Sequence, residues 1–95
     1  MDEALRAIAE PRRRAILRLV ASREMAAGEI ARHFDVSRPA ISQHLSLLRQ
    51  ARLVTERRDG TRRLYRARAQ GLDEIRAFLE DLRVASRSVA GTDGG

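Results

Sequence analysis

Five side chains near the middle of the sequence could form hydrogen bonds with a molecule outside the protein. They lie within "SRPAISQH" and are Ser37, Arg38, Ser42, Gln43 and His44. A helix with a purely structural role could present Glu, Lys and Arg to solvent, whereas this stretch presents mainly neutral donors and acceptors. Arginine can bond bidentately to guanine, glutamine to adenine, and a serine hydroxyl to either kind of base edge. Arg38, Gln43 and Ser42 therefore have the chemistry needed to read bases.

The other two residues of this group are expected to act differently. Ser37 is a good helix N-cap, so its oxygen stays on the backbone and the helix N-terminus is left facing a phosphate. His44 lies nearer the apolar side of the helix. That side carries Ile41, Leu45 and Leu48, which we expect to be buried. His44 should therefore contact a phosphate or brace the helix rather than read a base.

Positive charge is concentrated downstream of this stretch. The net charge is +6, and all 19 basic residues are arginines. Residues 52–68 hold seven arginines against Glu56 and Asp59, a balance of +5, whereas residues 70–83 hold four acids and two arginines, a balance of −2. Such a segment is typical of a surface that faces phosphates, although a solvated patch without a ligand has the same composition. If the external molecule is DNA, four arginines are expected to contact its flanking phosphates or its minor groove: Arg57, Arg58, Arg62 and Arg63.

The elements that position these residues follow from apolar periodicity and turn signals. Asp59 and Gly60 form a strong hairpin-turn signal. The expected elements are helices over 2–9, 11–22 and 27–34, a fourth helix capped by Ser37, strands over 53–57 and 62–67, and a last helix from about residue 70. The predicted fold is mainly α with a small β-hairpin, in the order α-α-α-α-β-β-α.

A helix, a three-residue break at 35–37, a second helix and a basic hairpin form the layout of a winged helix-turn-helix. In this layout the second helix of the pair enters the major groove of DNA, which is wide enough to admit it. The hairpin then reaches the flanking backbone. The sequence thus predicts binding to a double-stranded DNA operator.

The two terminal helices carry more apolar residues than a small core needs. In the last helix, apolar residues recur at alternating spacings of three and four, the pattern of a helix–helix seam. We predict a homodimer through Leu5, Ile8, Ile75, Phe78, Leu79 and Leu82. The alternative is that the seam packs only within its own chain.

The remaining composition narrows the class of protein. The sequence has no cysteine, so it has no disulfide framework and no thiolate chemistry. It also has no apolar run of about 18 residues that could span a membrane, and its acidic N-terminus is unlike a secretory signal. We predict a cytoplasmic protein with one domain over residues 1–85 and a flexible tail over 86–95.

Two stretches, "EPRRRAILRLV" and "EMAAGEIARHFDVSRPAISQHLSLLRQARLVTERRDGTRRLYRA", resemble the ArsR/SmtB group of bacterial transcriptional repressors over roughly residues 5–83. The resemblance implies a homodimer held by the first and last helices, whose two recognition helices read an inverted repeat. It also implies that Ser42, Gln43 and His44 occupy DNA-contacting positions. Arg52 stands where the group commonly has glycine, and it could cap the helix end or reach a phosphate.

The sequence departs from the metal-sensing members of this group. Those members carry a cysteine pair at the start of the third helix, where "EMAAGE" places Ala26 and Gly28. Others bind zinc through His and acidic residues of the last helix, which here has four acids and no His, although zinc prefers nitrogen and sulfur ligands. His33 and His44 lie on different helices without a third ligand. We therefore predict no metal site and no cofactor.

Three other classes of protein fit the sequence less well than a sequence-specific DNA-binding protein does. An enzyme is not expected, because no catalytic triad, glycine-rich phosphate loop or metal-ligand cluster is apparent. A winged-helix module that binds protein partners would need an apolar recognition face, and here that face is polar. A nonspecific DNA-binding protein would need the arginines but not Arg38, Ser42 or Gln43. The sequence leaves open whether a small-molecule or protein effector acts on the molecule.

Overall fold

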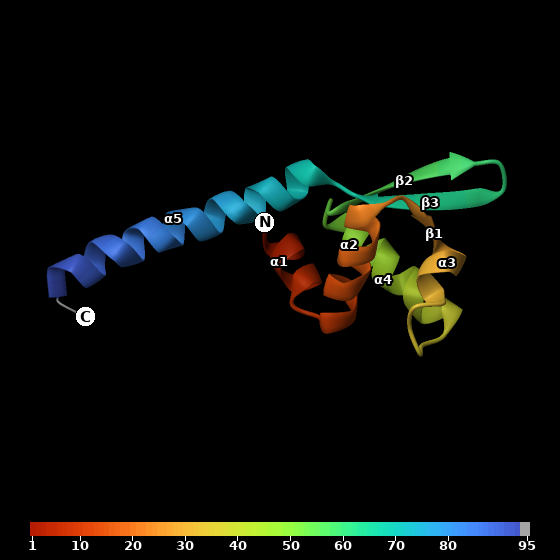
Figure 1. Cartoon of the computed structure of the whole chain (residues 1–95), viewed down its shortest axis with the longest axis horizontal. Coiled ribbons are helices and arrows are strands. Elements are labelled where there is room, and N and C mark those ends of the chain that lie inside the picture. The colour runs from red at the N-terminus through yellow and green to blue at the C-terminus, as the bar shows by residue number, and fades with distance from the viewer. Residues whose placement is uncertain (94–95) are drawn as a thin grey trace.

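Figure 1 shows the computed structural model, which describes the backbone of residues 1–93 and the side chains of residues 1–87. Five helices and three strands make up this part of the chain. They are α1 (Asp2–Ile8), α2 (Pro11–Ser22), β1 (Met25–Ala26), α3 (Ala27–Ala31), α4 (Arg38–Gln50), β2 (Val54–Asp59), β3 (Arg62–Ala67) and α5 (Ala69–Asp93). None of these helices is both long enough and apolar enough to cross a membrane.

The predicted winged helix-turn-helix fold is confirmed, with one additional strand. The expected hairpin of β2 and β3 is present, and its two-residue turn holds Gly60 at a φ of 65°. Strand β1 pairs antiparallel with β3, so that the sheet has the order β1-β3-β2. A strand of two residues is too short to show an alternating pattern, and it exists here because β3 supplies a partner. The observed order is therefore α-α-β-α-α-β-β-α.

The bounds of four elements differ from the sequence prediction, the smallest difference being that α1 ends at Ile8 rather than residue 9. Helix α3 ends at Ala31 rather than residue 34, so the break before α4 covers residues 32–37. Strand β2 starts and ends later than expected, at Val54 and Asp59. Helix α5 continues to Asp93, since each added residue of an existing helix gains a backbone hydrogen bond even without apolar periodicity.

The predicted tail, residues 86–95, is thus helical as far as Asp93. Its last two residues lie outside the part of the chain that the structure describes. The division of the chain into a folded domain and a flexible tail stays a prediction.

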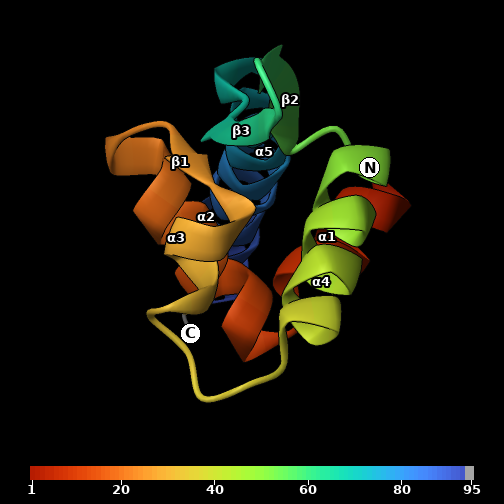
Figure 2. The same cartoon turned by 90° about the vertical axis from the view of Figure 1, so that its right-hand side faces the viewer.

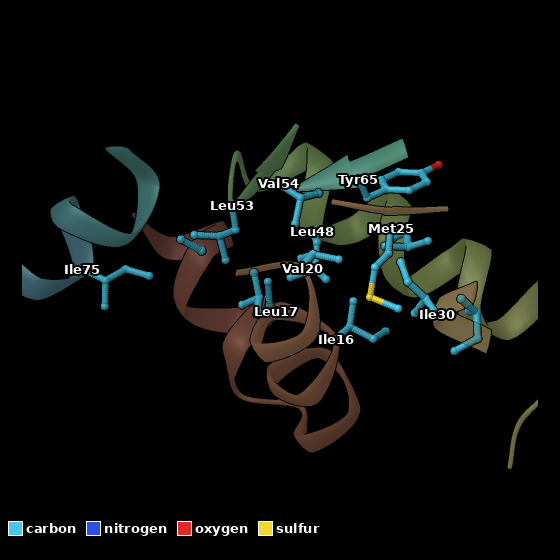
Figure 3. Close-up of a cluster of buried hydrophobic side chains, with 14 residues drawn as sticks. Ile16, Leu17, Val20, Met25, Ile30, Leu48, Leu53, Val54, Tyr65 and Ile75 are labelled. Carbon is cyan, nitrogen blue, oxygen red and sulfur yellow. The ribbon is translucent and has the colours of Figure 1, made fainter. Parts of the chain in front are cut away.

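The core lies where α2, α3, α4 and the sheet meet (Figure 3). Helices α2, α3 and α4 each contribute buried apolar side chains. The fully buried side chains are Ile16, Val20, Met25, Ile30, Ile41, Leu45, Leu48 and Leu53. No charged or polar side chain is buried among the described residues, so the functional groups of the chain lie at its surface.

Helix α5 projects away from the rest of the molecule (Figure 1). The radius of gyration is 16.4 Å and the longest dimension is 58 Å, whereas a compact chain of this length has a radius of gyration of about 12 Å. The start of α5 packs closely on the residues that end α4. At Gly71 the two segments are so close that a Cβ atom would overlap the carbonyl oxygen of Arg52. Beyond Ile75, every side chain of α5 that the structure describes is exposed.

Candidate nucleic-acid interface

The N-terminal end of α4 is built as the sequence predicts. The hydroxyl of Ser37 accepts a hydrogen bond from the backbone N–H of Ala40 at 3.2 Å and so caps the helix. Ile41, Leu45 and Leu48 are buried. Because these three residues fix one side of α4 in the core, the opposite side of the helix faces solvent.

The C-terminal end of α4 depends on Arg52, whose φ is 63°. The N–H of Arg52 bonds to the carbonyl of Arg49, and the N–H of Leu53 bonds to that of Leu48, both at 3.0 Å. This is the Schellman arrangement, in which a left-handed residue ends the helix. Of the two roles expected for Arg52, the structure shows that its backbone caps the helix.

Three of the predicted base-reading residues lie on the solvent face of α4. Arg38, Ser42 and Gln43 are all exposed. The guanidinium of Arg38 lies beside α3, since a Cβ atom added to Gly28 would be 3.4 Å from its Nη1. Figure 2 shows α3 and α4 side by side below the hairpin, with α5 running away behind them. These three side chains can therefore reach a ligand that approaches this end of the molecule.

His44 faces the interior of the molecule and braces α4. Its side chain is 18% exposed, and its Nδ1 lies 3.3 Å from Nη1 of Arg13 and 4.0 Å from a carboxylate oxygen of Glu10. The same guanidinium donates to the carbonyls of Ala7 and Arg6 at the end of α1. Arg13 thus joins α1 to α4 through His44, which matches the bracing role that the sequence left open. A DNA contact by His44 stays a prediction.

The wing, defined here as residues 54–67, presents its predicted arginines in two different ways. Arg57 forms a two-pronged ion pair with Glu24, at 3.0 and 2.8 Å, and Arg62 lies 2.7 Å from Glu29. Glu24 precedes β1, and Glu29 lies on α3. These two arginines hold the wing against the β1–α3 segment, so part of their charge is already compensated within the chain.

Arg58 and Arg63 lie opposite each other in the ladder between β2 and β3. Like charges placed directly opposite on neighbouring strands repel each other. Nη1 of Arg63 is 4.0 Å from Glu56, and Arg58 forms no ion pair within the described residues. Of the four arginines predicted for the wing, Arg58 and Arg63 are therefore the two most available to an external anion.

Some residues at this surface were not singled out in the sequence. Arg32 and Arg49 line a groove between α4 and the wing together with Arg38 and Ser42. Arg49 lies in the last turn of α4, where arginine is unremarkable because it suits the helix dipole. Only its position opposite the wing marks it as part of this site, and that position depends on tertiary contacts.

The residues predicted for dimerisation lie in two environments. Ile75 is only 7% exposed and belongs to the core of its own chain, and Leu5 and Ile8 are partly buried against that core. Ile75 contacts its own chain because it lies near the start of α5, and its part in a dimer stays a prediction. Phe78, Leu79 and Leu82 are exposed by 37 to 55%. Leu72, which belongs to the same apolar pattern of the last helix, is also exposed, as are Met1 and Val84 elsewhere in the chain.

The described residues contain no group of three or more His, Cys, Asp or Glu side chains that could hold a metal ion. His33 is exposed on the turn after α3, whereas His44 is on α4. Ala26 and Gly28, at the positions of the cysteine pair, offer no side-chain ligand.

Comparison with known proteins agrees with this architecture. Residues 10–56, which include α2, α3 and α4, match the family described as bacterial regulatory protein, arsR family. The HTH-type transcriptional regulator Rv2034 of Mycobacterium tuberculosis is 48% identical over 79 residues, covering 83% of this chain and 74% of that protein. This chain belongs to the ArsR family. It is accordingly not an enzyme.

Two further proteins show how far the similarity of this ArsR-family chain extends. The transcriptional repressor SdpR of Bacillus subtilis is 45% identical over 60 residues, covering 63% of this chain and 67% of that protein. The solved structure of an ArsR-like transcriptional regulator from Rhodococcus sp. RHA1 superposes with a TM-score of 0.82 at 27% identity, covering 95% of this chain and 86% of that one. The similarity thus includes the long terminal helix as well as the winged helix-turn-helix.

Proposed function

We propose that this ArsR-family protein is a homodimeric repressor of transcription that binds an inverted-repeat operator in double-stranded DNA. The observation that carries the proposal is the solvent face of α4. On this face Ser42 and Gln43 offer neutral hydrogen-bond donors and acceptors, and Arg38 offers a guanidinium group. The opposite face of α4 is buried in the core. The sequence similarity to SdpR, a transcriptional repressor, favours repression over activation.

In this proposal the N-terminal half of α4 enters the major groove. Arg38 pairs with guanine, Gln43 with adenine, and Ser42 with either edge. The N-terminus of α4 and the arginines of the wing contact phosphates on both sides. Arg58 and Arg63 supply the stronger wing contacts, since Arg57 and Arg62 are paired with Glu24 and Glu29.

The homodimer is proposed to form through α5 and α1. The exposed residues Leu72, Phe78, Leu79 and Leu82 leave an apolar stripe on a helix that projects from its own domain. An apolar depression of about 350 Å³ between Ile8 and α5 adjoins this stripe. Burying such a surface against a second copy is favourable, and two-fold symmetry makes the operator an inverted repeat.

We further propose that DNA binding does not respond to metal ions and that the protein acts in the bacterial cytoplasm, on the nucleoid. Thiophilic ions need thiolates, of which the chain has none. Zinc without imidazole would have to gather carboxylates from both subunits. An effector, if one acts here, is then a small molecule or a protein.

Electrophoretic mobility shift with the DNA upstream of the protein's own gene tests the proposal. We expect a shift at nanomolar protein that survives excess random competitor DNA, and a footprint with two-fold symmetry. The half-site centres should lie about one helical turn, roughly 34–36 Å, apart. Equal competition by random DNA would contradict sequence-specific recognition and favour a nonspecific DNA-binding protein. A single asymmetric half-site would contradict the dimer.

A further inference from the structure

A groove of about 540 Å³ lies between α4 and the wing. It begins beside Arg38 and Ser42 at the reading end of α4 and extends to the last turn of that helix. Five arginines and two glutamates line it, a net charge of +3: Arg32, Arg38, Arg49, Arg62 and Arg63 against Glu29 and Glu56. Even if each glutamate neutralises one arginine, the groove keeps an excess of positive charge, which favours the binding of an anion.

In this groove, the Glu56 carboxylate contacts one side chain from α4 and two from β3. One of its carboxylate oxygens accepts hydrogen bonds from Nη1 of Arg49 on α4 and from the hydroxyl of Tyr65 on β3, both at 3.0 Å. Nη1 of Arg63 lies 4.0 Å from the same oxygen. Burial and the bond to Glu56 raise the pKa of the Tyr65 hydroxyl, which keeps it a donor. One carboxylate thus holds two guanidinium groups close together and compensates one of them.

The shape of DNA indicates which anion this groove would take. The proposed function places α4 in the major groove and the wing against the adjacent minor groove. The sugar–phosphate strand that separates these two grooves then has to pass between α4 and the wing. It carries one negative charge per phosphate, which suits a groove with excess guanidinium groups.

We propose that this groove seats the sugar–phosphate backbone between the two DNA grooves, with Arg49 as an additional phosphate contact and Glu56 as the residue that positions Arg49 and Arg63. The inference rests on the proposed function. Arg49 is half-exposed, whereas Glu56 is only 21% exposed. Arg49 can therefore reach a phosphate while it remains anchored to Glu56.

Arg49→Ala tests the contact. We expect affinity for the operator and for random DNA to fall alike, by about tenfold, since one charge-assisted hydrogen bond is lost. The slope of log K against log salt should decrease by about 0.9. Arg87→Ala, in the C-terminal part of α5, is the matched control and should change neither quantity.

Neutral methylphosphonate linkages, placed one at a time along the operator, locate the phosphate. One position should weaken the wild-type protein by about as much as Arg49→Ala does and should weaken Arg49→Ala no further. If no position behaves in this way, or if Arg49→Ala binds with unchanged affinity and salt slope, the proposed contact is wrong.

Glu56 is tested by two substitutions that remove the same charge. Simple repulsion between Glu56 and DNA predicts tighter binding for both Glu56→Ala and Glu56→Gln. Positioning instead predicts that Glu56→Ala binds several-fold more weakly, while Glu56→Gln, which keeps an oxygen for Arg49 and Tyr65, retains wild-type affinity or exceeds it. Circular dichroism establishes that each variant is folded. Tighter binding by Glu56→Ala would overturn the positioning role. If Glu56→Ala is unfolded, the single variants Tyr65→Phe and Arg49→Ala take its place, and unchanged DNA affinity in both of them would overturn the role.

Failure of this inference can be told apart from failure of the proposed function. Wild-type protein that discriminates the operator from random DNA, combined with an inert Arg49→Ala, contradicts only the groove contact. Wild-type protein that binds both DNAs equally contradicts the proposed function, whatever Arg49→Ala does.

Discussion

Gln43 and Arg58 are both exposed and polar, but they lie on different parts of the proposed DNA surface. Gln43 is on the solvent face of α4, whereas Arg58 is in the wing opposite Arg63. Gln43→Ala should cost about 1–3 kcal/mol on the operator and reduce discrimination against random DNA, since a base contact is lost; Arg38→Ala should behave in the same way. Arg58→Ala should weaken all sequences evenly and lower the salt slope by about 1.

Fluorescence anisotropy with operator and scrambled duplexes at several salt concentrations measures both effects. Arg62→Ala provides a comparison within the wing, and we expect a smaller loss than for Arg58→Ala because Arg62 is paired with Glu29 at 2.7 Å. An unchanged ratio of specific to random binding in Gln43→Ala would show that the reading face is misassigned.

Arg52 adopts a left-handed conformation that an L-residue with a Cβ atom reaches only at a cost. Arg52→Gly should therefore raise the free energy of unfolding by about 1 kcal/mol, partly offset by the greater freedom of glycine in the unfolded chain. The hydrogen bond from Arg68 is kept, because it goes to the backbone oxygen of Arg52. Urea unfolding followed by circular dichroism measures the change. Gly60→Ala, at the other positive φ of 65°, should shift stability in the opposite direction.

At the level of elements, the wing is held to the β1–α3 segment by two glutamates. The hydrogen bond and charge of Arg57 lower the pKa of Glu24, against an opposing effect of burial. A backbone hydrogen bond from Ala26 lowers the pKa of Glu29, again opposed by burial, and the charge of Arg62 adds to the lowering. Each carboxylate therefore stabilises the folded state while it is ionised.

The direction of the pH dependence follows from these lowered pKa values. Above the ordinary value of 4.5 both glutamates are ionised in the folded and unfolded states, and their contribution is complete. As the pH falls below 4.5 the unfolded chain takes up protons first, so stability declines until the folded carboxylates are protonated. Thermal unfolding between pH 7 and pH 3 should show this decline, and Glu24→Gln should show less of it. An equally steep decline in Glu24→Gln would mean that other carboxylates cause it.

At the level of the whole molecule, the exposed stripe of α5 leads to a prediction about assembly. Leu79 is 55% exposed in the single chain, and we expect it to be buried in a homodimer. Sedimentation velocity at micromolar concentration should give a dimer for the wild-type protein and a monomer for Leu79→Asp, because the charge would lose its hydration in an apolar interface. Leu47→Asp, an exposed leucine on α4, is the control and should remain dimeric. A wild-type monomer would contradict the predicted assembly.

The composition of the whole chain leads to a prediction about metal ions. Zinc, cadmium, arsenite and nickel at about ten micromolar should leave the mobility shift unchanged, because the chain has no thiolate and its two histidines lie on different elements. The same titration after chelation is the control. The contrary outcome is a loss of DNA binding that a metal ion causes and a chelator reverses. If Asp73→Ala or Asp81→Ala made the protein insensitive to that ion, the result would show a metal site built from acids of α5.

Local signals in the sequence were sufficient for most of the fold. The Ser37 cap and the burial of Ile41, Leu45 and Leu48 were predicted correctly, and β3 has the expected bounds. These features depend on hydrogen bonds and periodicity within a few residues, so they can be recognised without knowing what the element packs against. The exposure of the face of α4 opposite that apolar stripe follows from the same periodicity.

The tertiary structure decided which residues of each predicted set are free to act. Arg57 and Arg58 are neighbours in the sequence, but only Arg57 meets a glutamate, and that glutamate lies 33 positions away. Ile75 and Leu79 belong to one apolar stripe, but Ile75 is buried in its own chain and Leu79 is not. Periodicity shows which side chains share a face, whereas the partner of that face is set by long-range packing. For the same reason the convergence of Arg49 and Tyr65 on Glu56 was visible only in the folded chain.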